Sequence, residues 1–258
     1  MERLRIRDTG IRVALPRGAA RVGSSSVLLL HGAGASHRQW GPFIEALAPG
    51  FVPIAVDLPG HGESDGTVAP SLDAAVEFLA ELFEALRLPT PLWCIGHSAG
   101  GVLALSLALH YPKRLSGLCT IASAPRLQLH PDFVQQARHG RFEYELARGG
   151  FARSDDPWAE LVYDDLCKVR FGPASMFDGE HLDVRAALPN LRVPLLAIGA
   201  GSDRIVSPRH SRSLAAGVPR GTCVTLNDAG HYVHLEQPRQ AAREFHDWAE
   251  RLQREQGA

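Results

Sequence analysis

The sequence predicts an α/β protein with a mostly parallel central sheet and helices on both of its faces. Short, continuously apolar segments alternate along the chain with longer segments whose apolar residues recur at helical spacing. Continuously apolar strands are typical of a parallel sheet covered on both faces, and strand–helix alternation is typical of the α/β class. With 258 residues, the chain is long enough to bury a sizeable core without covalent cross-links.

The predicted strands and helices follow one another in a regular order. A hairpin is expected where Asp8-Thr9-Gly10 separates the alternating segments 5–7 and 11–15. Ser71 is expected to cap a helix that extends to Leu86. The other predicted strands are 27–30, 51–56, 92–95, 115–122, 193–199 and 223–226, and the other predicted helices are 37–47, 99–110, 208–216 and 238–253.

The segment 125–189 interrupts this alternation. It is richer in charged and aromatic residues than the rest, and its periodicity is irregular. Helices are expected around residues 132–148, 156–170 and 178–188. We therefore interpret residues 1–124 and 190–258 as one core, divided by an inserted helical segment.

Composition and charge narrow the class of protein. The net charge is −1, with 27 Lys and Arg against 28 Asp and Glu, so no bulk attraction to nucleic acid or acidic membranes is expected. No apolar run approaches the roughly 20 residues of a membrane helix, and residues 1–7 lack the apolar core of a secretory signal. The four cysteines show no zinc-binding spacing. Cys94, Cys119 and Cys223 lie in or beside apolar, strand-like segments and are expected to be small buried thiols. These features favour a cytoplasmic protein without nucleic-acid or membrane partners.

The stretch Gly96-His97-Ser98-Ala99-Gly100 matches G-x-S-x-G, the nucleophile elbow of serine hydrolases. It lies between an apolar strand and an alanine- and leucine-rich helix, as that turn requires. The elbow strains the backbone of the nucleophile, so its neighbours must be small, as Gly96, Ala99 and Gly100 are. Ser98 is therefore the predicted nucleophile, and the alternative is a glycine-rich turn without chemistry.

A serine hydroxyl needs a base that takes its proton, and the base needs an acid that orients it. His231 is preferred over His234 as the base because it follows the last predicted strand in a glycine-bearing loop. Asp203 follows the strand before that one and is preferred over Asp228, which is too near His231 in sequence to reach back easily. The chain order of Ser98, Asp203 and His231 is the one typical of G-x-S-x-G hydrolases.

An oxyanion hole requires two backbone N–H groups directed at the developing negative charge. Ala99 is expected to supply one, because it follows the nucleophile. Ala33 is expected to supply the other, from the loop His31-Gly32-Ala33-Gly34 after strand 27–30. The alternative is that this loop is only a glycine-rich turn.

Together these motifs resemble the α/β-hydrolase superfamily over about residues 3–252. The matching segments are His31-Gly32-Ala33-Gly34, Asp57-Leu58-Pro59-Gly60-His61-Gly62-Glu63-Ser64, Gly96-His97-Ser98-Ala99-Gly100-Gly101, Asp203 and Gly230-His231. The resemblance implies the α/β-hydrolase fold, with residues 125–189 as a helical cap. It also implies a Ser-His-Asp carboxylesterase for small to medium acyl esters that needs no metal or organic cofactor. The turn 57–64, similar to a signature turn of the family, is interpreted as structural.

Several members of this superfamily catalyse other reactions. Haloalkane dehalogenases and epoxide hydrolases use a carboxylate as nucleophile, so the serine at position 98 argues against both. Carbon–carbon bond hydrolases and haloperoxidase-like perhydrolases share the triad and stay alternatives. A non-catalytic ligand-binding protein of this fold is the less favoured alternative, because nucleophile, acid and base are all present.

Substrate preference is expected to depend on the cap and on the residue after the base. The aromatic candidates for the pocket wall are Phe133, Phe142, Phe151, Trp158, Tyr163, Phe177 and Tyr232. The alternative for each cap residue is packing of the cap onto the core. The expected partner is a small-molecule ester, and the expected assembly is a monomer or homodimer.

Overall fold

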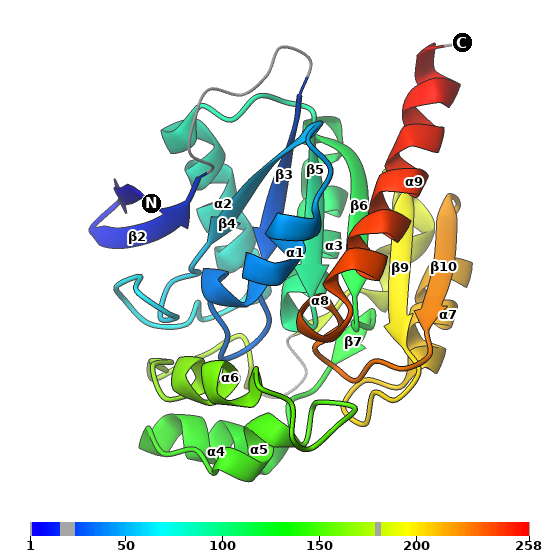
Figure 1. Cartoon of the computed structure of the whole chain (residues 1–258). Helices are drawn as coiled ribbons and strands as arrows, with labels where there is room; N and C mark the ends of the chain where they lie inside the picture. Colours follow the sequence, from blue (N-terminus) through cyan, green and yellow to red (C-terminus); the bar gives the residue numbers. More distant parts are fainter. Residues whose placement is uncertain (1, 16–23, 179–181, 258) are drawn as a thin grey trace.

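An eight-stranded sheet runs through the centre of the molecule, with helices on both sides (Figure 1). The coordinates are a computed structural model that describes residues 2–15, 24–178 and 182–257. The strands, in their order across the sheet, are β1 (Glu2–Ile6), β2 (Thr9–Ala14), β4 (Phe51–Val56), β3 (Ser25–Leu30), β5 (Leu92–His97), β6 (Leu115–Ile121), β9 (Leu195–Ala200) and β10 (Gly221–Leu226). The β1–β2 and β2–β4 pairs are antiparallel and the others are parallel, so the predicted hairpin and the mostly parallel sheet are confirmed.

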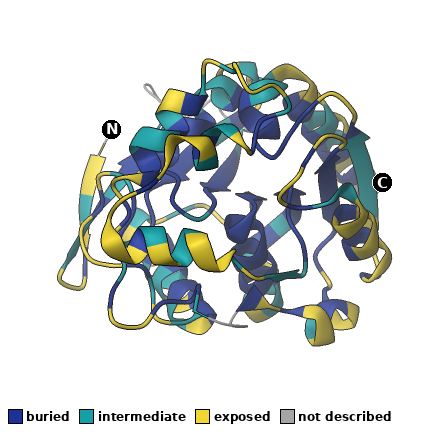
Figure 2. Cartoon of the chain, turned by 90° about the horizontal axis from the view of Figure 1, so that it is seen from below, coloured by how far each residue is buried: buried dark blue, intermediate teal, exposed yellow. Residues whose placement is uncertain are grey.

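Successive residues of each central strand point to opposite faces, and this separates two apolar cores. Leu28 and Leu30 belong to one core, which also contains residues of helices α2 (Leu72–Leu86), α3 (Ala99–His110) and α7 (Pro208–Ala216). Val27 and Leu29 belong to the other, which contains residues of 3₁₀ helix η1 (His37–Trp40) and helices α1 (Gly41–Ala46), α8 (Val233–Glu236) and α9 (Pro238–Gly257). Figure 2 shows the buried strands enclosed by helices whose outer faces are exposed.

The helices begin and end largely where the sequence signals place them. Ser71 caps α2 as predicted, since its hydroxyl accepts a hydrogen bond of 3.1 Å from the Ala74 N–H. The predicted helix 37–47 is divided into η1 and α1, with Pro42 in the first turn of α1, where its missing N–H costs nothing. A short 3₁₀ helix, η2 (Pro112–Arg114), leads from α3 into β6.

The inserted segment differs most from expectation. It contains α4 (Pro131–His139), α5 (Tyr144–Arg148) and α6 (Ala159–Leu166), which lie beyond the carboxyl ends of the parallel strands (Figure 1). The helix predicted over 132–148 breaks at Gly140, whose φ of 61° ends α4. The helix predicted over 156–170 is confined to α6.

The prediction of a helix over 178–188 is wrong for the described part of that range. Residues 179–181 lie outside the described residues. In its place, β8 (Leu182–Asp183) pairs antiparallel with β7 (Arg126–Leu127), and the 3₁₀ helix η3 (Arg185–Asn190) follows. The pairing partner of β8 is far away in sequence, so no local period could reveal it. The boundaries of the insertion at residues 125 and 189 stay a prediction.

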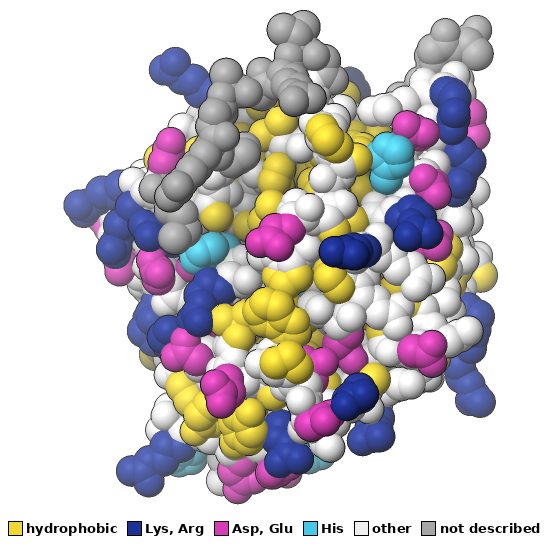
Figure 3. All heavy atoms as spheres, in the orientation of Figure 1, with side chains coloured by type: hydrophobic (Ala, Val, Ile, Leu, Met, Phe, Trp, Pro, Cys, Tyr) yellow, Lys and Arg dark blue, Asp and Glu magenta, His cyan; other side chains and the backbone are white. Residues whose placement is uncertain are grey.

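Charges of both signs are mixed on the molecular surface. On the face shown in Figure 3, Lys and Arg side chains alternate with Asp and Glu side chains. This mixture agrees with the net charge of −1. No helix in the described part of the chain combines the length and apolar character needed to cross a bilayer.

Candidate active site

Ser98 lies in a strained turn between β5 and α3. Its φ is 50° and its ψ is −119°, a backbone conformation that residues other than glycine rarely adopt. A side chain at Gly96 would overlap the carbonyl group of Gly100, and one at Gly100 would overlap the carbonyl of His31. The Ser98 N–H donates a hydrogen bond of 2.9 Å to the carbonyl of Ile121 on the neighbouring strand. The turn is therefore held by the sheet on one side and by close backbone contacts on the other.

His231 and Asp203 form a buried pair at the ends of the last two strands. His231 Nδ1 lies 2.9 Å from Asp203 Oδ2, and both residues are buried. The other carboxylate oxygen, Oδ1, accepts hydrogen bonds of 2.7 and 2.8 Å from the N–H groups of Ile205 and Val206. A carboxylate only accepts, so Nδ1 carries a proton, which leaves Nε2 as the nitrogen that can accept one.

Ser98 and His231 line the same cavity, which has a volume of about 180 Å³. Asp203 is connected to this cavity through its bond to His231. The structure thus brings the predicted nucleophile, base and acid together from turns after β5, β9 and β10. These turns meet at the carboxyl edge of the sheet, where ligands bind in open α/β sheets.

The two predicted oxyanion donors lie beside Ser98. Ala33 lines the cavity, and Ala99 is the first residue of α3, where backbone N–H groups have no partner within the helix. Within the described residues, neither the Ala33 N–H nor the Ala99 N–H meets a hydrogen-bond acceptor.

A buried network supports the loop that carries Ala33. His31 Nε2 accepts a hydrogen bond of 3.0 Å from the Leu58 N–H, and its Nδ1 donates to the Gly32 carbonyl at 2.8 Å. Burial lowers the pKa of His31, which favours this neutral form. Asp57 accepts bonds from the His37 N–H and Nδ1 and from the Glu63 N–H, at 2.6, 2.9 and 2.9 Å. These bonds join two loops, in agreement with a structural role for the turn 57–64.

The aromatic candidates divide into two groups. Phe133 and Tyr232 line the cavity. The others do not line it. Phe142 packs on Phe133, Phe151 on Tyr232, Tyr163 on Tyr144 and Phe177 on Phe171, while Trp158 is half-buried against the main core. Phe151 and Phe177 contact Tyr232 and His61 of the core, as the alternative of cap-to-core packing expects, whereas Phe142 and Tyr163 pack against aromatic residues of the insertion itself.

Aliphatic residues of the insertion form much of the cavity wall, where aromatic residues were expected. Leu146, Val162 and Leu166 of the insertion line the cavity together with Gln39 of the core. The i,i+4 spacing of Val162 and Leu166 places both on one face of α6, and this spacing is a signal that could have found them.

Helix α6 is bound to the core loop through a buried carboxylate. Asp165 accepts hydrogen bonds of 2.8 Å from Ser36 Oγ and 2.9 Å from Gln39 Nε2, and Arg38 lies 3.4 Å away. Burial raises the pKa of Asp165 to about 6. Arg38 also pairs with Asp164, the preceding residue of α6. Sequence reasoning missed this network because its partners are distant along the chain.

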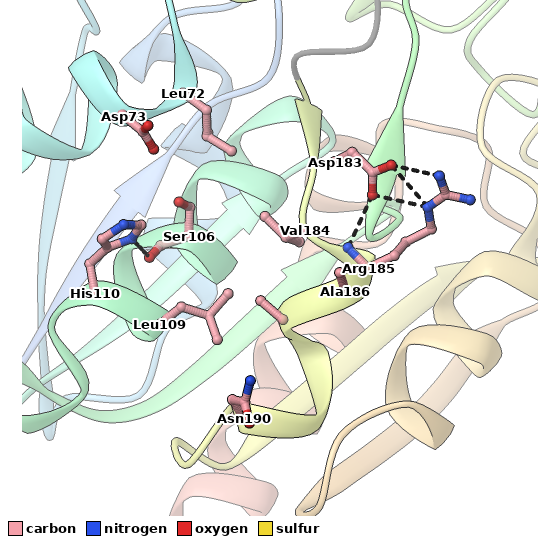
Figure 4. A pocket seen from close by; sticks show the side chains of 11 residues that line it. Leu72, Asp73, Ser106, Leu109, His110, Asp183, Val184, Arg185, Ala186 and Asn190 are labelled. Carbon is pink, nitrogen blue, oxygen red and sulfur yellow. Dashed lines mark hydrogen bonds and ion pairs between the residues drawn. The ribbon is translucent and has the colours of Figure 1, made fainter.

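A larger hollow of about 930 Å³ lies elsewhere, between the first turn of α2, the end of α3 and η3 (Figure 4). It shares no wall residue with the cavity beside Ser98. His110 Nδ1 donates to the backbone carbonyl of Ser106 rather than contacting its hydroxyl. The carboxylate of Asp183 is bound by Arg185. This hollow therefore lacks a nucleophile paired with a base among its described residues, and the smaller cavity is the candidate active site.

The described residues form no metal site. They contain no group of three or more His, Cys, Asp or Glu side chains that could hold a metal ion. The thiols of Cys94 and Cys119 are buried and free, Cys223 is half-buried, and Cys167 is exposed. The burial expected for Cys94, Cys119 and Cys223 is confirmed for the first two and holds only in part for Cys223.

The fold, and the strained turn that carries Ser98 between β5 and α3, are typical of hydrolases of the α/β class. Residues 27–244 match the Alpha/beta hydrolase family, and the chain belongs to that family. The predicted family and fold are therefore confirmed.

Known relatives narrow the class further. The chain is 32% identical over 231 residues to a pimeloyl-[acyl-carrier protein] methyl ester esterase of Stenotrophomonas maltophilia, covering 81% of this chain and 86% of that protein. It is 29% identical over 252 residues to the biotin biosynthesis bifunctional protein BioHC of Teredinibacter turnerae. That match covers 84% of this chain but only 43% of that protein.

A solved structure shares the fold. A thermophilic esterase from Thermogutta terrifontis superimposes with a TM-score of 0.78 at 23% identity, covering 98% of this chain and 99% of that one. Homology to esterases over most of the chain supports the predicted class, a carboxylic ester hydrolase.

Proposed function

We propose that the protein is a carboxylesterase that cleaves small to medium acyl esters through Ser98, His231 and Asp203. The observation that carries this proposal is the buried pair of His231 and Asp203 at a cavity that Ser98 also lines. Asp203 holds the imidazole in the tautomer that a general base requires and stabilises its charged form.

The proposed reaction proceeds through an acyl-enzyme. Nε2 of His231 takes the hydroxyl proton of Ser98 while the serine oxygen forms a bond to the ester carbonyl carbon. The N–H groups of Ala33 and Ala99 bind the oxyanion of the tetrahedral intermediate. The bond to the alcohol then breaks, and the alcohol leaves with the proton from His231. Water, deprotonated by His231, attacks the acyl-enzyme and releases the acid and Ser98.

The volume of the cavity favours a small substrate. Its volume of about 180 Å³ is below the roughly 300 Å³ at which drug-sized ligand pockets begin. Its wall includes Phe133, Leu146, Val162 and Leu166, which suit an alkyl or acyl chain. The Stenotrophomonas maltophilia relative is a methyl ester esterase, so methyl esters belong among the substrates to test. A cytoplasmic location and a monomeric or homodimeric state are proposed from the sequence alone.

The proposal is tested with p-nitrophenyl esters from acetate to decanoate, together with methyl esters of the same acids. Wild-type protein should hydrolyse the shorter members, and Ser98→Ala should lose this turnover while keeping its melting temperature. An organophosphonate should label Ser98, as mass spectrometry of the digested protein would show. Turnover or labelling that persists in Ser98→Ala would place the nucleophile elsewhere and refute the proposal.

A further inference from the structure

His97 is a buried residue of the cavity wall that the proposed reaction does not use. It ends β5, directly before Ser98, and its exposed fraction is 2%. Its ring packs against the rings of His231, His234 and Tyr232, with centroids 4.7, 4.4 and 5.8 Å away. The side chain thus lies between the predicted nucleophile and the loop that carries the predicted base.

One hydrogen bond determines which nitrogen of the His97 ring carries a proton. His97 Nε2 lies 2.9 Å from the backbone carbonyl oxygen of His231. A carbonyl only accepts, so Nε2 carries a proton and donates it. Nδ1 has no hydrogen-bond partner among the described residues. Burial, with smaller contributions from His234, His231 and His31, lowers the pKa of His97 well below its ordinary value, so the ring stays neutral with Nδ1 unprotonated.

The backbone of His231 is held on both sides. Its N–H donates a hydrogen bond of 2.6 Å to the Gly150 carbonyl of the insertion. Its carbonyl accepts the bond from His97, the one donor that it meets among the described residues. The side chain is bound in turn by Asp203. Without His97, the carbonyl side of the base would lose its only described anchor.

The same ring also contacts the loop of the proposed oxyanion hole. A Cβ atom added to Gly32 would lie 3.0 Å from His97 Nδ1 and 3.2 Å from the Ser98 Cβ. The His97 ring therefore fills the space between the Gly32 backbone and the base loop.

We propose that His97 is a positioning residue that fixes the backbone of His231, and through it the imidazole, between Asp203 and Ser98. This inference rests on the proposed function. A misplacement of about 1 Å can reduce catalysis by roughly 10²-fold, so a single anchoring bond at the base can have a large effect on rate. The effect should fall on kcat rather than KM, because the bond does not touch the substrate.

The test compares three variants. His97→Leu removes the donor, whereas His97→Gln keeps an N–H group that can reach the same carbonyl. His234→Leu is the matched control, because it removes a buried imidazole of the same cluster that has no described bond to the backbone of His231. Melting temperatures show whether each variant folds.

Two quantities are measured for each variant. The first is kcat and KM on the best p-nitrophenyl ester. The second is the far-downfield proton resonance of the His231 Nδ1–H bound to Asp203, assigned by its absence in His231→Gln. His97→Leu should lower kcat by roughly 10–10²-fold with little change in KM and should broaden or shift the resonance. His97→Gln should restore most of both, and His234→Leu should change both much less.

The outcomes separate this inference from the proposed function. If wild-type protein hydrolyses no ester, the proposed function fails, and the resonance alone decides whether His97 orders His231. If His97→Leu folds and retains wild-type kcat and an unchanged resonance, the inference is refuted. Equal losses in His97→Leu, His97→Gln and His234→Leu would also refute it, because packing rather than the bond would then be responsible.

Discussion

The carboxylate of Asp203 is bound on both oxygens, and each oxygen has a different task. Oδ1 is held by the N–H groups of Ile205 and Val206, and Oδ2 accepts from His231 Nδ1. The two bonds to Oδ1 orient the carboxylate, and the single bond to Oδ2 orients the imidazole. At the scale of single residues, a chain of fixed orientations thus leads from the backbone of Ile205 and Val206 through Asp203 to the imidazole of His231.

Asp203→Asn separates these two tasks. The amide oxygen can still accept from Ile205 and Val206, but the amide nitrogen cannot accept from His231 Nδ1. The imidazole should then shift to the tautomer that has no free acceptor for the serine proton, and kcat should fall by roughly 10⁴-fold with little loss of stability. Ester kinetics and thermal unfolding measure the two effects. A loss of less than about tenfold would contradict the role proposed for Asp203.

The residues at the site were predictable to different degrees. Ser98, Asp203 and His231 each follow a predicted strand in a glycine-bearing turn, so the G-x-S-x-G motif and the order along the chain suggested them. His97 belongs to the same motif, but its role depends on a bond to a backbone atom of a distant loop. No pattern of residue types encodes such a bond.

At the scale of elements, the link between α6 and the loop before α1 depends on a carboxylate that is costly to ionise. Asp165 is 1% exposed and receives bonds from Ser36 and Gln39, with Arg38 nearby and Asp57 as an unfavourable neighbour. Because Gln39 and Leu166 both line the cavity, this link also fixes two parts of its wall. The protonation of one buried group is therefore coupled to the contact between insertion and core.

The pKa of Asp165 gives the sign of a pH effect. The folded-state pKa of about 6 exceeds the unfolded value of about 3.9, so between these pH values the folded protein holds a proton that the unfolded chain has released. The contribution of Asp165 to stability therefore falls as pH rises through this window, by about 3 kcal/mol in total. Asp165→Asn removes this dependence and keeps an oxygen for Ser36 and Gln39.

The free energy of unfolding of Asp165→Asn, relative to wild type, should thus increase between about pH 4 and pH 7. Urea denaturation at several pH values measures it. Asp164→Asn is the control, because Lys168 and Arg38 lower the pKa of that half-exposed carboxyl, so its effect on stability has the opposite sign and is confined to pH values below about 4, and its relative stability should stay nearly constant between about pH 4 and pH 7. A relative stability of Asp165→Asn that does not change with pH would show that the buried carboxyl is not the titrating group.

At the scale of the whole molecule, the sheet and the insertion were not equally predictable. The apolar strands alternate between two cores, so a short stretch of sequence such as Val27 to Leu30 already encodes both of its faces. The insertion packs through contacts between distant segments, such as the pairing of Arg126 with Asp183 in β7 and β8. Its local periodicity is weak for this reason, and so the helix expected over 178–188 was wrong.

The insertion and the core share the cavity, and Leu166 lies at their contact. A Cβ atom added to Gly34 would lie 2.5 Å from Leu166 Cδ2, so this side chain packs directly on the loop that carries Ala33. Leu166→Ala should enlarge the cavity on the side of the insertion. Longer acyl chains should then fit, and the ratio of kcat/KM for decanoate to that for butyrate p-nitrophenyl esters should rise by roughly tenfold, since each added buried methylene is worth about 0.8 kcal/mol.

The substitution also removes buried apolar atoms, which should cost about 2–5 kcal/mol of stability. Leu182→Ala is the matched control, because Leu182 is equally buried in the insertion but does not line the cavity. Both variants should be destabilised, and only Leu166→Ala should change the preference for chain length. If the two variants change the ratio equally, or if neither changes it, the acyl chain does not occupy the space between α6 and the core. The cavity wall formed by Phe133 and Leu146 would then be the next part to substitute, since it borders the same space from α4 and α5.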